Sequence, residues 1–104
     1  MGEKDFIKSL GHRNRLRISF VTERGRVVRI DVVQYEAEIG GRWLALVRYD
    51  CAHGFLHRDV MRPDGSHEKS RVPAADLEEG LNLAIEELER QWQFYRRVYE
   101  EAMK

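Results

Sequence analysis

The sequence predicts an α+β protein in which an antiparallel sheet of about five strands, a meander, packs against one long C-terminal helix. Apolar and polar residues alternate through much of residues 16–72, which is typical of strands buried on one face. Short glycine-containing turns separate these segments, and such connections favour antiparallel neighbours. From residue 77 onward the apolar spacing changes to three and four, the period of a helix.

The bulk properties indicate one α+β domain over residues 1–104, because a chain of this length builds a single core. An apolar fraction of 42% is typical of a globular chain rather than a disordered one. The apolar runs are far shorter than the roughly 20 residues that cross a bilayer. Cys51 is the only cysteine, so it has no internal disulfide partner. We therefore expect a cytoplasmic protein with no membrane contact and no cofactor.

The first half of the chain contains the longest expected strand. Residues 1–13 are expected to form an irregular lead-in or a short helix. Residues 16–20 alternate as a strand, and residues 23–26 form a turn. A long strand follows over residues 27–39, and its alternation changes phase at Val32–Val33. This change predicts either a β-bulge or a strand that is buried on both faces.

The second half of the sheet begins at Gly40–Gly41, a dipeptide that predicts a tight hairpin turn. Beyond it we expect a third strand over residues 42–50 and, after a connection at 51–54, a fourth strand over residues 55–62. A turn at 63–65 then leads to a fifth strand over residues 67–72. Because the connections are short, the third and fourth strands should pair antiparallel.

The C-terminal helix is expected to begin after Asp76, a good N-cap, with Glu79 completing a capping box. Apolar residues then form one continuous stripe to Ala102. A helix over Leu77–Met103 would be about 40 Å long at ~1.5 Å per residue. Strands of six to nine residues span only roughly 20–30 Å. We therefore expect the helix to overhang the sheet and to form a homodimer through its uncovered apolar stripe.

Charge is segregated along the chain, although the formal net charge is +0. Residues 1–75 contain 14 Lys or Arg and 10 Asp or Glu. Residues 76–104 contain 4 Lys or Arg and 8 Asp or Glu. Fourteen of the 18 cations are arginine, the residue best suited to forked contacts with phosphate. A surplus of +4 in the first part is nevertheless too small to establish nucleic-acid binding.

The segment from Arg48 to Asp59 contains the side chains best suited to catalysis. Imidazoles transfer protons near neutral pH, arginines stabilise phosphate groups, and aspartates orient imidazoles. Such a set suits metal-independent RNA cleavage, in which a 2′-hydroxyl attacks the adjacent phosphate. The candidate catalytic residues are His57, His53, Arg48, Arg58, Asp50 and Asp59. In a regular strand, however, Arg58 points away from its neighbours His57 and Asp59.

Two other interpretations apply to the same residues. In the first interpretation the residues form purely structural polar pairs, His57 with Asp59 and Arg48 with Asp50. The second is a zinc site, but His53 and His57 lie ~13 Å apart in an extended segment, which is too far to share one ion. We therefore expect no metal site here unless a tight turn at Gly54 brings the two histidines together.

The segment Val47-Arg48-Tyr49-Asp50-Cys51-Ala52-His53-Gly54-Phe55-Leu56-His57-Arg58-Asp59, followed by Pro63-Asp64-Gly65 and a long helix, resembles the TumE-like family of toxins. These are the toxin partners of type II toxin–antitoxin pairs, and they have uncharacterised relatives with an RYD-x-AHG core. The likeness covers roughly residues 27–103 and is specific around 47–65. The family pattern has R-Y-D-N-A-P-H and then H-x-H. Here Cys51 replaces the Asn, the Pro is absent, and only His57 remains of the second group.

The resemblance implies a toxin component that acts on RNA and is paired with an antitoxin protein. From the chemistry of the residues we expect His57 and His53 to serve as acid and base, with Arg48 and Arg58 on the phosphate. Asp50 or Asp59 would orient an imidazole. The alternative function is a non-catalytic interaction module that dimerises through its C-terminal helix.

Overall fold

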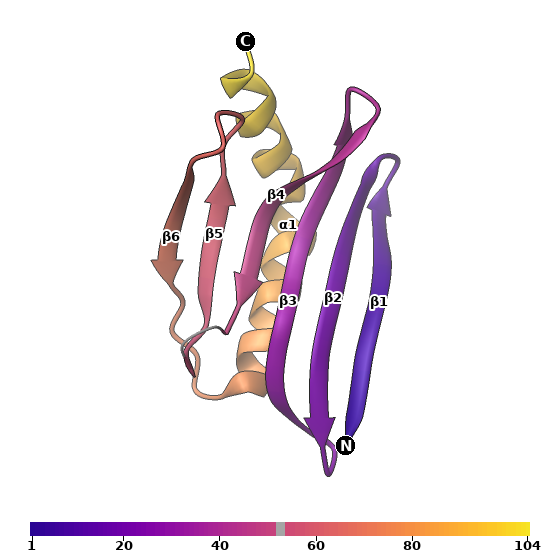
Figure 1. The fold of residues 1–104 in the computed structure, drawn as a ribbon, viewed down its shortest axis with the longest axis vertical. Coiled ribbons are helices and arrows are strands. Elements are labelled where there is room, and N and C mark those ends of the chain that lie inside the picture. The colour runs from indigo at the N-terminus through magenta and orange to yellow at the C-terminus, as the bar shows by residue number, and fades with distance from the viewer. Residues whose placement is uncertain (52–53) are drawn as a thin grey trace.

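The protein forms one six-stranded antiparallel sheet, with neighbouring strands in chain order, and a long helix across one face (Figure 1). The computed structural model describes residues 1–51 and 54–104. The elements are β1 (Gly2–Gly11), β2 (Asn14–Glu23), β3 (Arg26–Ile39), β4 (Arg42–Asp50), β5 (His57–Met61), β6 (His67–Arg71) and α1 (Leu77–Ala102). The predicted α+β class, meander topology and C-terminal helix are confirmed.

The N-terminal segment differs from its prediction, because residues 2–11 form the edge strand β1 rather than an irregular lead-in. This strand pairs with β2 from Gly2 opposite Thr22 to Gly11 opposite Asn14. Phe6 and Ile7 are adjacent in sequence, and both are about half exposed. β1 therefore depends on backbone pairing rather than on burial of one face, so it lacks the alternation by which strands are recognised.

β3 contains β-bulges, as one of the two interpretations of its phase change predicted, but they lie before Val32–Val33. The register with β2 skips Val28 and Asp31, which have no partner of their own. As a result Val27, Ile30 and Val33 are three residues apart, yet all of them pack against the core below the sheet. A bulge changes the side-chain alternation in this way because it adds one residue to one strand only.

Helix α1 begins at the predicted cap, where Asp76 Oδ1 accepts a 2.9 Å hydrogen bond from the Glu79 backbone N–H. Leu81, Ala84 and Leu88 are buried beneath the sheet. The expected overhang is wrong, because Trp92, Tyr95 and Tyr99 also pack against the core. β3 has 14 residues, a length of about 46 Å, and therefore matches the helix. Within the described residues, no helix is long and apolar enough to span a membrane.

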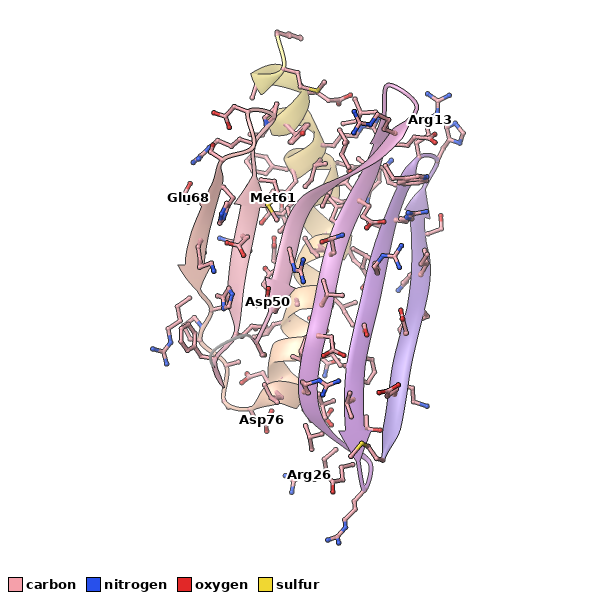
Figure 2. The ribbon with its side chains drawn as sticks, in the orientation of Figure 1. Arg13, Arg26, Asp50, Met61, Glu68 and Asp76 are labelled. Carbon is pink, nitrogen blue, oxygen red and sulfur yellow. The ribbon has the colours of Figure 1, made fainter. Side chains whose placement is uncertain are left out.

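The two faces of the sheet have different character. We call the face opposite α1 the open face, since no helix within residues 1–51 and 54–104 covers it (Figures 1 and 2). Alternation along β4 directs Val47 and Tyr49 into the core and places Arg48 and Asp50 on the open face. The candidate residues of β4 therefore lie away from the helix.

Candidate functional site on the open face

The register between β4 and β5 brings most of the predicted site residues together. Arg48 lies opposite Asp59, and Asp50 lies opposite His57. Because directly opposed residues in an antiparallel pair share a face, these four side chains form one group on the open face. His53, the fifth candidate, lies outside the described residues. We call the four residues Arg48, Asp50, His57 and Asp59 the open-face group.

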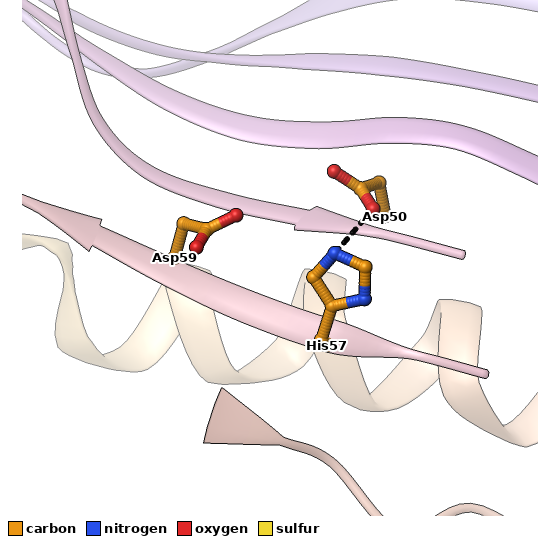
Figure 3. A group of neighbouring side chains, drawn as sticks. All are labelled: Asp50, His57 and Asp59. Carbon is orange, nitrogen blue, oxygen red and sulfur yellow. Dashed lines mark ion pairs between the residues drawn. The ribbon is translucent and has the colours of Figure 1, made fainter. Parts of the chain in front are cut away.

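Asp50 contacts two other members of the open-face group, His57 and Arg48. Its Oδ1 lies 2.8 Å from His57 Nε2 (Figure 3), and its Oδ2 lies 3.3 Å from Arg48 Nε. Two neighbours on different strands therefore fix the orientation of one carboxylate. The predicted ion pair of Arg48 with Asp50 is confirmed.

Asp59 is paired on its other side, with β6. Its Oδ1 lies 3.0 Å from Nδ1 of His67, whose side chain is half exposed. Asp59 itself is 6% exposed. His67 is not among the candidate site residues of the sequence, because no spacing supports its joining them, but the short β5–β6 hairpin returns it to this face.

His57 is buried although it lies on the face without a helix, and its exposure is only 2%. Cross-strand neighbours flank it, with Asp50 on β4 and Arg71 on β6. The Phe55 ring lies 5.8 Å from the imidazole, and the Arg71 guanidinium stacks 4.6 Å above that ring. A group this well covered meets a substrate poorly. His57 is therefore better placed to hold Asp50 than to touch an RNA substrate.

A surface hollow of about 260 Å³ adjoins the open-face group. It lies where β3 and β4 run side by side. Its lining residues are Arg29, Ile30, Asp31, Arg48, Asp50 and Cys51. The hollow thus contains two arginine–aspartate pairs, since Arg29 Nε lies 2.6 Å from Asp31 Oδ1 and Arg48 Nε lies 3.3 Å from Asp50 Oδ2. Its two guanidinium groups are of the kind that contact phosphate. Arg29 was not predicted as a site residue, because it lies on β3, far from the 48–59 segment in sequence.

Cys51 lines the same hollow but is a poor nucleophile. Burial, and then the charge of Asp50, raises the pKa of its thiol. Thiolate, not thiol, is the reactive form of cysteine. The sulfur therefore lies in the hollow mainly as a small apolar group.

Arg58 does not belong to the open-face group, as the alternation of β5 predicted. Its Nη1 donates to the Tyr95 hydroxyl at 3.2 Å and lies 3.7 Å from Glu87 Oε1, so it faces helix α1. The same Glu87 oxygen accepts hydrogen bonds from the hydroxyls of Tyr49 at 2.9 Å and Tyr95 at 2.7 Å. Burial, and then the Glu87 charge, raises the pKa of Tyr49 to about 12. This second polar cluster joins the sheet to the helix.

This second polar cluster was not predicted from the sequence. Glu87 is adjacent to the buried Leu88 and two helical turns before Tyr95, so it lies beside the apolar stripe of α1. The available signal for the cluster was a carboxylate beside the apolar stripe of the helix, together with tyrosines and an arginine on the strands. Its strand partners depend on packing between distant segments, and no local pattern predicts that.

A third polar cluster lies farther along the open face, around the buried Glu36. Its carboxylate accepts hydrogen bonds from Arg15 Nε at 2.7 Å and from Gln34 Nε2 at 2.7 Å, and Arg17 Nε lies 3.4 Å away. Burial opposes ionisation of Glu36, but the hydrogen bonds and charges of these neighbours outweigh it, so the pKa of Glu36 is lowered. This cluster is a closed structural network of opposite charges.

Three residues of the open-face group also have the side chains to hold a cation. Asp50, His57 and Asp59 each offer one ligand atom, and these atoms all lie within 4.8 Å of one another (Figure 3). One imidazole and two carboxylates are a common donor set for divalent metals.

Fold and site together define an α+β protein with a helix on one face of a meander sheet and a polar group on the other. Its sequence matches, over residues 1–104, the family described as Domain of unknown function (DUF7718), and the chain belongs to that family. No curated protein and no solved structure matches the chain.

Proposed function

We propose that the protein is the toxin component of a toxin–antitoxin pair and that it cleaves RNA at the hollow beside the open-face group. The observation that carries the proposal is the position of Asp50. This carboxylate is held by His57 and Arg48 at the edge of a hollow that also contains Arg29. The resemblance of residues 47–65 to TumE-like toxins supports the same conclusion.

In the proposed reaction, Asp50 accepts the proton of a ribose 2′-hydroxyl as that oxygen attacks the adjacent phosphorus. Arg48 and Arg29 stabilise the negative charge that develops on the phosphate oxygens. The bond to the 5′-oxygen breaks, that oxygen takes a proton from water, and a 2′,3′-cyclic phosphate remains. His57 is a positioning residue that orients Asp50, which reverses the roles expected from the sequence. No step of this reaction requires a metal ion. The reaction would take place in the cytoplasm, and an antitoxin would bind the toxin there.

The test is cleavage of labelled single-stranded RNA by the purified protein, with detection of the cyclic phosphate end. His57→Ala should lower the rate by ~10²-fold, because it removes a contact that orients the proposed base, and misplacement by about 1 Å can cost that much. Asp50→Asn keeps the size of the side chain and should abolish proton acceptance. His12→Ala is the matched control, since His12 is exposed in the turn between β1 and β2.

The proposal fails if the parent protein, at high concentration and in fresh preparations, produces no cyclic phosphate. It also fails if Asp50→Asn cleaves RNA as fast as the parent. Rescue of the rate by His57→Gln would support positioning, because an amide can still donate to Asp50 whereas it cannot exchange protons as imidazole does.

A second candidate function is an interaction module that forms a homodimer through α1. Leu83, Phe94 and Val98 favour it, because their side chains are 39–48% exposed on the helix. The apolar area is smaller than the sequence predicted, since Trp92, Tyr95 and Tyr99 pack against the sheet. Light scattering at increasing concentration tests it. A dimer that Val98→Glu dissociates would support it, whereas a monomer at high micromolar concentration would exclude it.

A further inference from the structure

We infer that Asp50, His57 and Asp59 form a binding site for one divalent transition-metal ion, of which Zn²⁺ fits best. The binding itself is independent of the proposed RNA cleavage. Its consequence rests on that proposal: an ion held here takes up the Asp50 carboxylate and so inhibits cleavage. The inference thus adds a means of regulation to the open face.

The geometry needs only small adjustments to receive an ion. Asp50 and His57 face each other across β4 and β5, and Asp59 follows two residues after His57 on the same face. Their three ligand atoms lie within 4.8 Å of one another, with His57 Nε2 and Asp50 Oδ1 only 2.8 Å apart. Ligand atoms around a tetrahedral Zn²⁺ are about 3.4 Å apart, given bonds of about 2.1 Å. Rotations of the side chains bring the three atoms to this spacing.

The burial of the three residues also favours a cation. His57 is 2% exposed, Asp59 is 6% exposed, and the side chain of Asp50 is 15% exposed. Two carboxylates removed from water beside one another are costly unless positive charge compensates them. Arg48 and His67 supply part of this compensation from outside the group. A divalent ion would supply it from between the three ligand atoms, which lie within 4.8 Å of one another.

The neighbours would continue to hold the ligands after an ion binds. Arg48 contacts the Oδ2 atom of Asp50, the oxygen that the ion does not need. His67 holds Asp59 from β6. Such hydrogen-bonded partners behind the ligands are a regular feature of metal sites, because they fix the orientation of the carboxylates. The open-face group therefore already contains this outer layer.

The donor types select the class of metal. Imidazole nitrogen with carboxylate oxygen suits Zn²⁺, Fe²⁺ and Mn²⁺, whereas Mg²⁺ prefers oxygen alone. Zn²⁺ binds more tightly than Mn²⁺ to a given set of such ligands. The hollow of about 260 Å³ reaches Asp50 and gives solvent access to that side of the group. Water can therefore complete the coordination of an ion with three protein ligands.

Binding is tested on the native chain with Zn²⁺ by calorimetry and with Mn²⁺ by NMR. Zn²⁺ should bind at one ion per chain and raise the temperature of unfolding. Paramagnetic Mn²⁺ should first broaden the signals of residues 49–51 and 57–60, without any substitution that could disturb the fold. His57→Gln and Asp59→Asn should each weaken Zn²⁺ binding on the order of tenfold or more. His12→Ala, which removes an exposed histidine, should bind Zn²⁺ like the parent.

The inference is overturned if Zn²⁺ shows no saturable binding, or if Mn²⁺ broadens other acidic regions and leaves β4 and β5 unaffected. Unchanged affinity in folded Asp59→Asn would overturn it as well. Cleavage is then measured separately, with a chelator and with added Zn²⁺. Binding without any cleavage in chelator would remove the proposed function and leave the metal site. Cleavage in chelator without Zn²⁺ binding would remove the metal site and leave the function.

Discussion

His57 and Asp50 lie directly opposite each other on neighbouring strands, with His57 Nε2 2.8 Å from Asp50 Oδ1. The imidazole is almost fully buried, although it projects from the face that the helix leaves open. The pair therefore belongs both to the packing of the sheet and to the candidate site. A change in one partner should affect the stability of the fold as well as any chemistry at the hollow.

Energetic coupling between the two residues should be measurable in a double-mutant cycle. His57→Ala should lower the free energy of unfolding by about 1–3 kcal/mol, because it removes one hydrogen-bonding contact of a partly buried carboxylate. Asp50→Ala should lower it similarly. The double variant should lose less than the sum of the two, by roughly 0.5–3 kcal/mol. Urea unfolding of the four proteins checks this, and strictly additive losses would show that the contact contributes no stability.

Glu36 should make the protein less stable in acid. The pKa of Glu36 is lowered in the folded state from its ordinary value of 4.5, so its stabilising contribution is complete above that value. That contribution is lost as the pH falls through the lower folded value. Glu36→Gln should be less stable at neutral pH and should show a shallower loss of stability in acid.

The control for this experiment is Glu68→Gln, because the Glu68 side chain is 74% exposed. Its loss should hardly change either quantity. Parallel acid profiles for the parent and Glu36→Gln would mean that the Arg15 and Gln34 contacts do not favour ionised Glu36 in solution.

Tyr49 should cause the opposite behaviour, a loss of stability in alkali. Its pKa is raised from 10.0 to about 12 in the folded protein. Between these values the unfolded chain loses the phenolic proton and the folded chain keeps it, so stability falls as the pH rises. Tyr49→Phe should have a smaller slope over this interval, measured by urea unfolding at several pH values. An unchanged slope would assign the alkaline loss to other groups, such as Tyr95, whose pKa is also raised.

The sequence predicted the faces of the site better than its contacts. Strict alternation places Arg48 with Asp50, and His57 with Asp59, on one face of each strand and turns Arg58 away. All of this is confirmed. The partners across strands follow from the register, which moves by one residue with any bulge. Local spacing therefore suggested His57 with Asp59, whereas the structure pairs His57 with Asp50 and Asp59 with His67.

The same reasoning explains which elements of the fold were predictable. β4 has its predicted bounds because the Gly40–Gly41 turn marks its start, and α1 begins at its predicted cap because Asp76 and the apolar stripe mark it. β1 was missed because its apolar residues do not alternate. The predicted overhang of the helix was wrong because β3, with 14 residues, is longer than the strands of six to nine residues with which the helix was compared. Local patterns thus identified the elements, and their packing required the structure.

The two arginines of the candidate segment provide a matched pair for testing which face acts on RNA. Arg48 lines the open-face hollow, whereas Arg58 lies against α1 with Tyr95 and Glu87. Arg48→Gln should lower the cleavage rate on the order of tenfold or more, because it removes a charge that stabilises the reacting phosphate. Arg58→Gln should mainly lower stability, since Glu87 and the two tyrosines lose a positive neighbour beneath the sheet.

The measurements are cleavage kinetics under single-turnover conditions and urea unfolding of each variant. Arg48 carries a side chain that is 45% exposed, so its replacement should change the free energy of unfolding little. A low rate in Arg48→Gln with nearly unchanged stability therefore indicates that Arg48 acts at the hollow, either on the phosphate or by orienting Asp50. The reverse result, in which Arg58→Gln stops cleavage while remaining folded and Arg48→Gln cleaves normally, would move the reaction to the helix side of β5. The open-face group would then be a structural polar network.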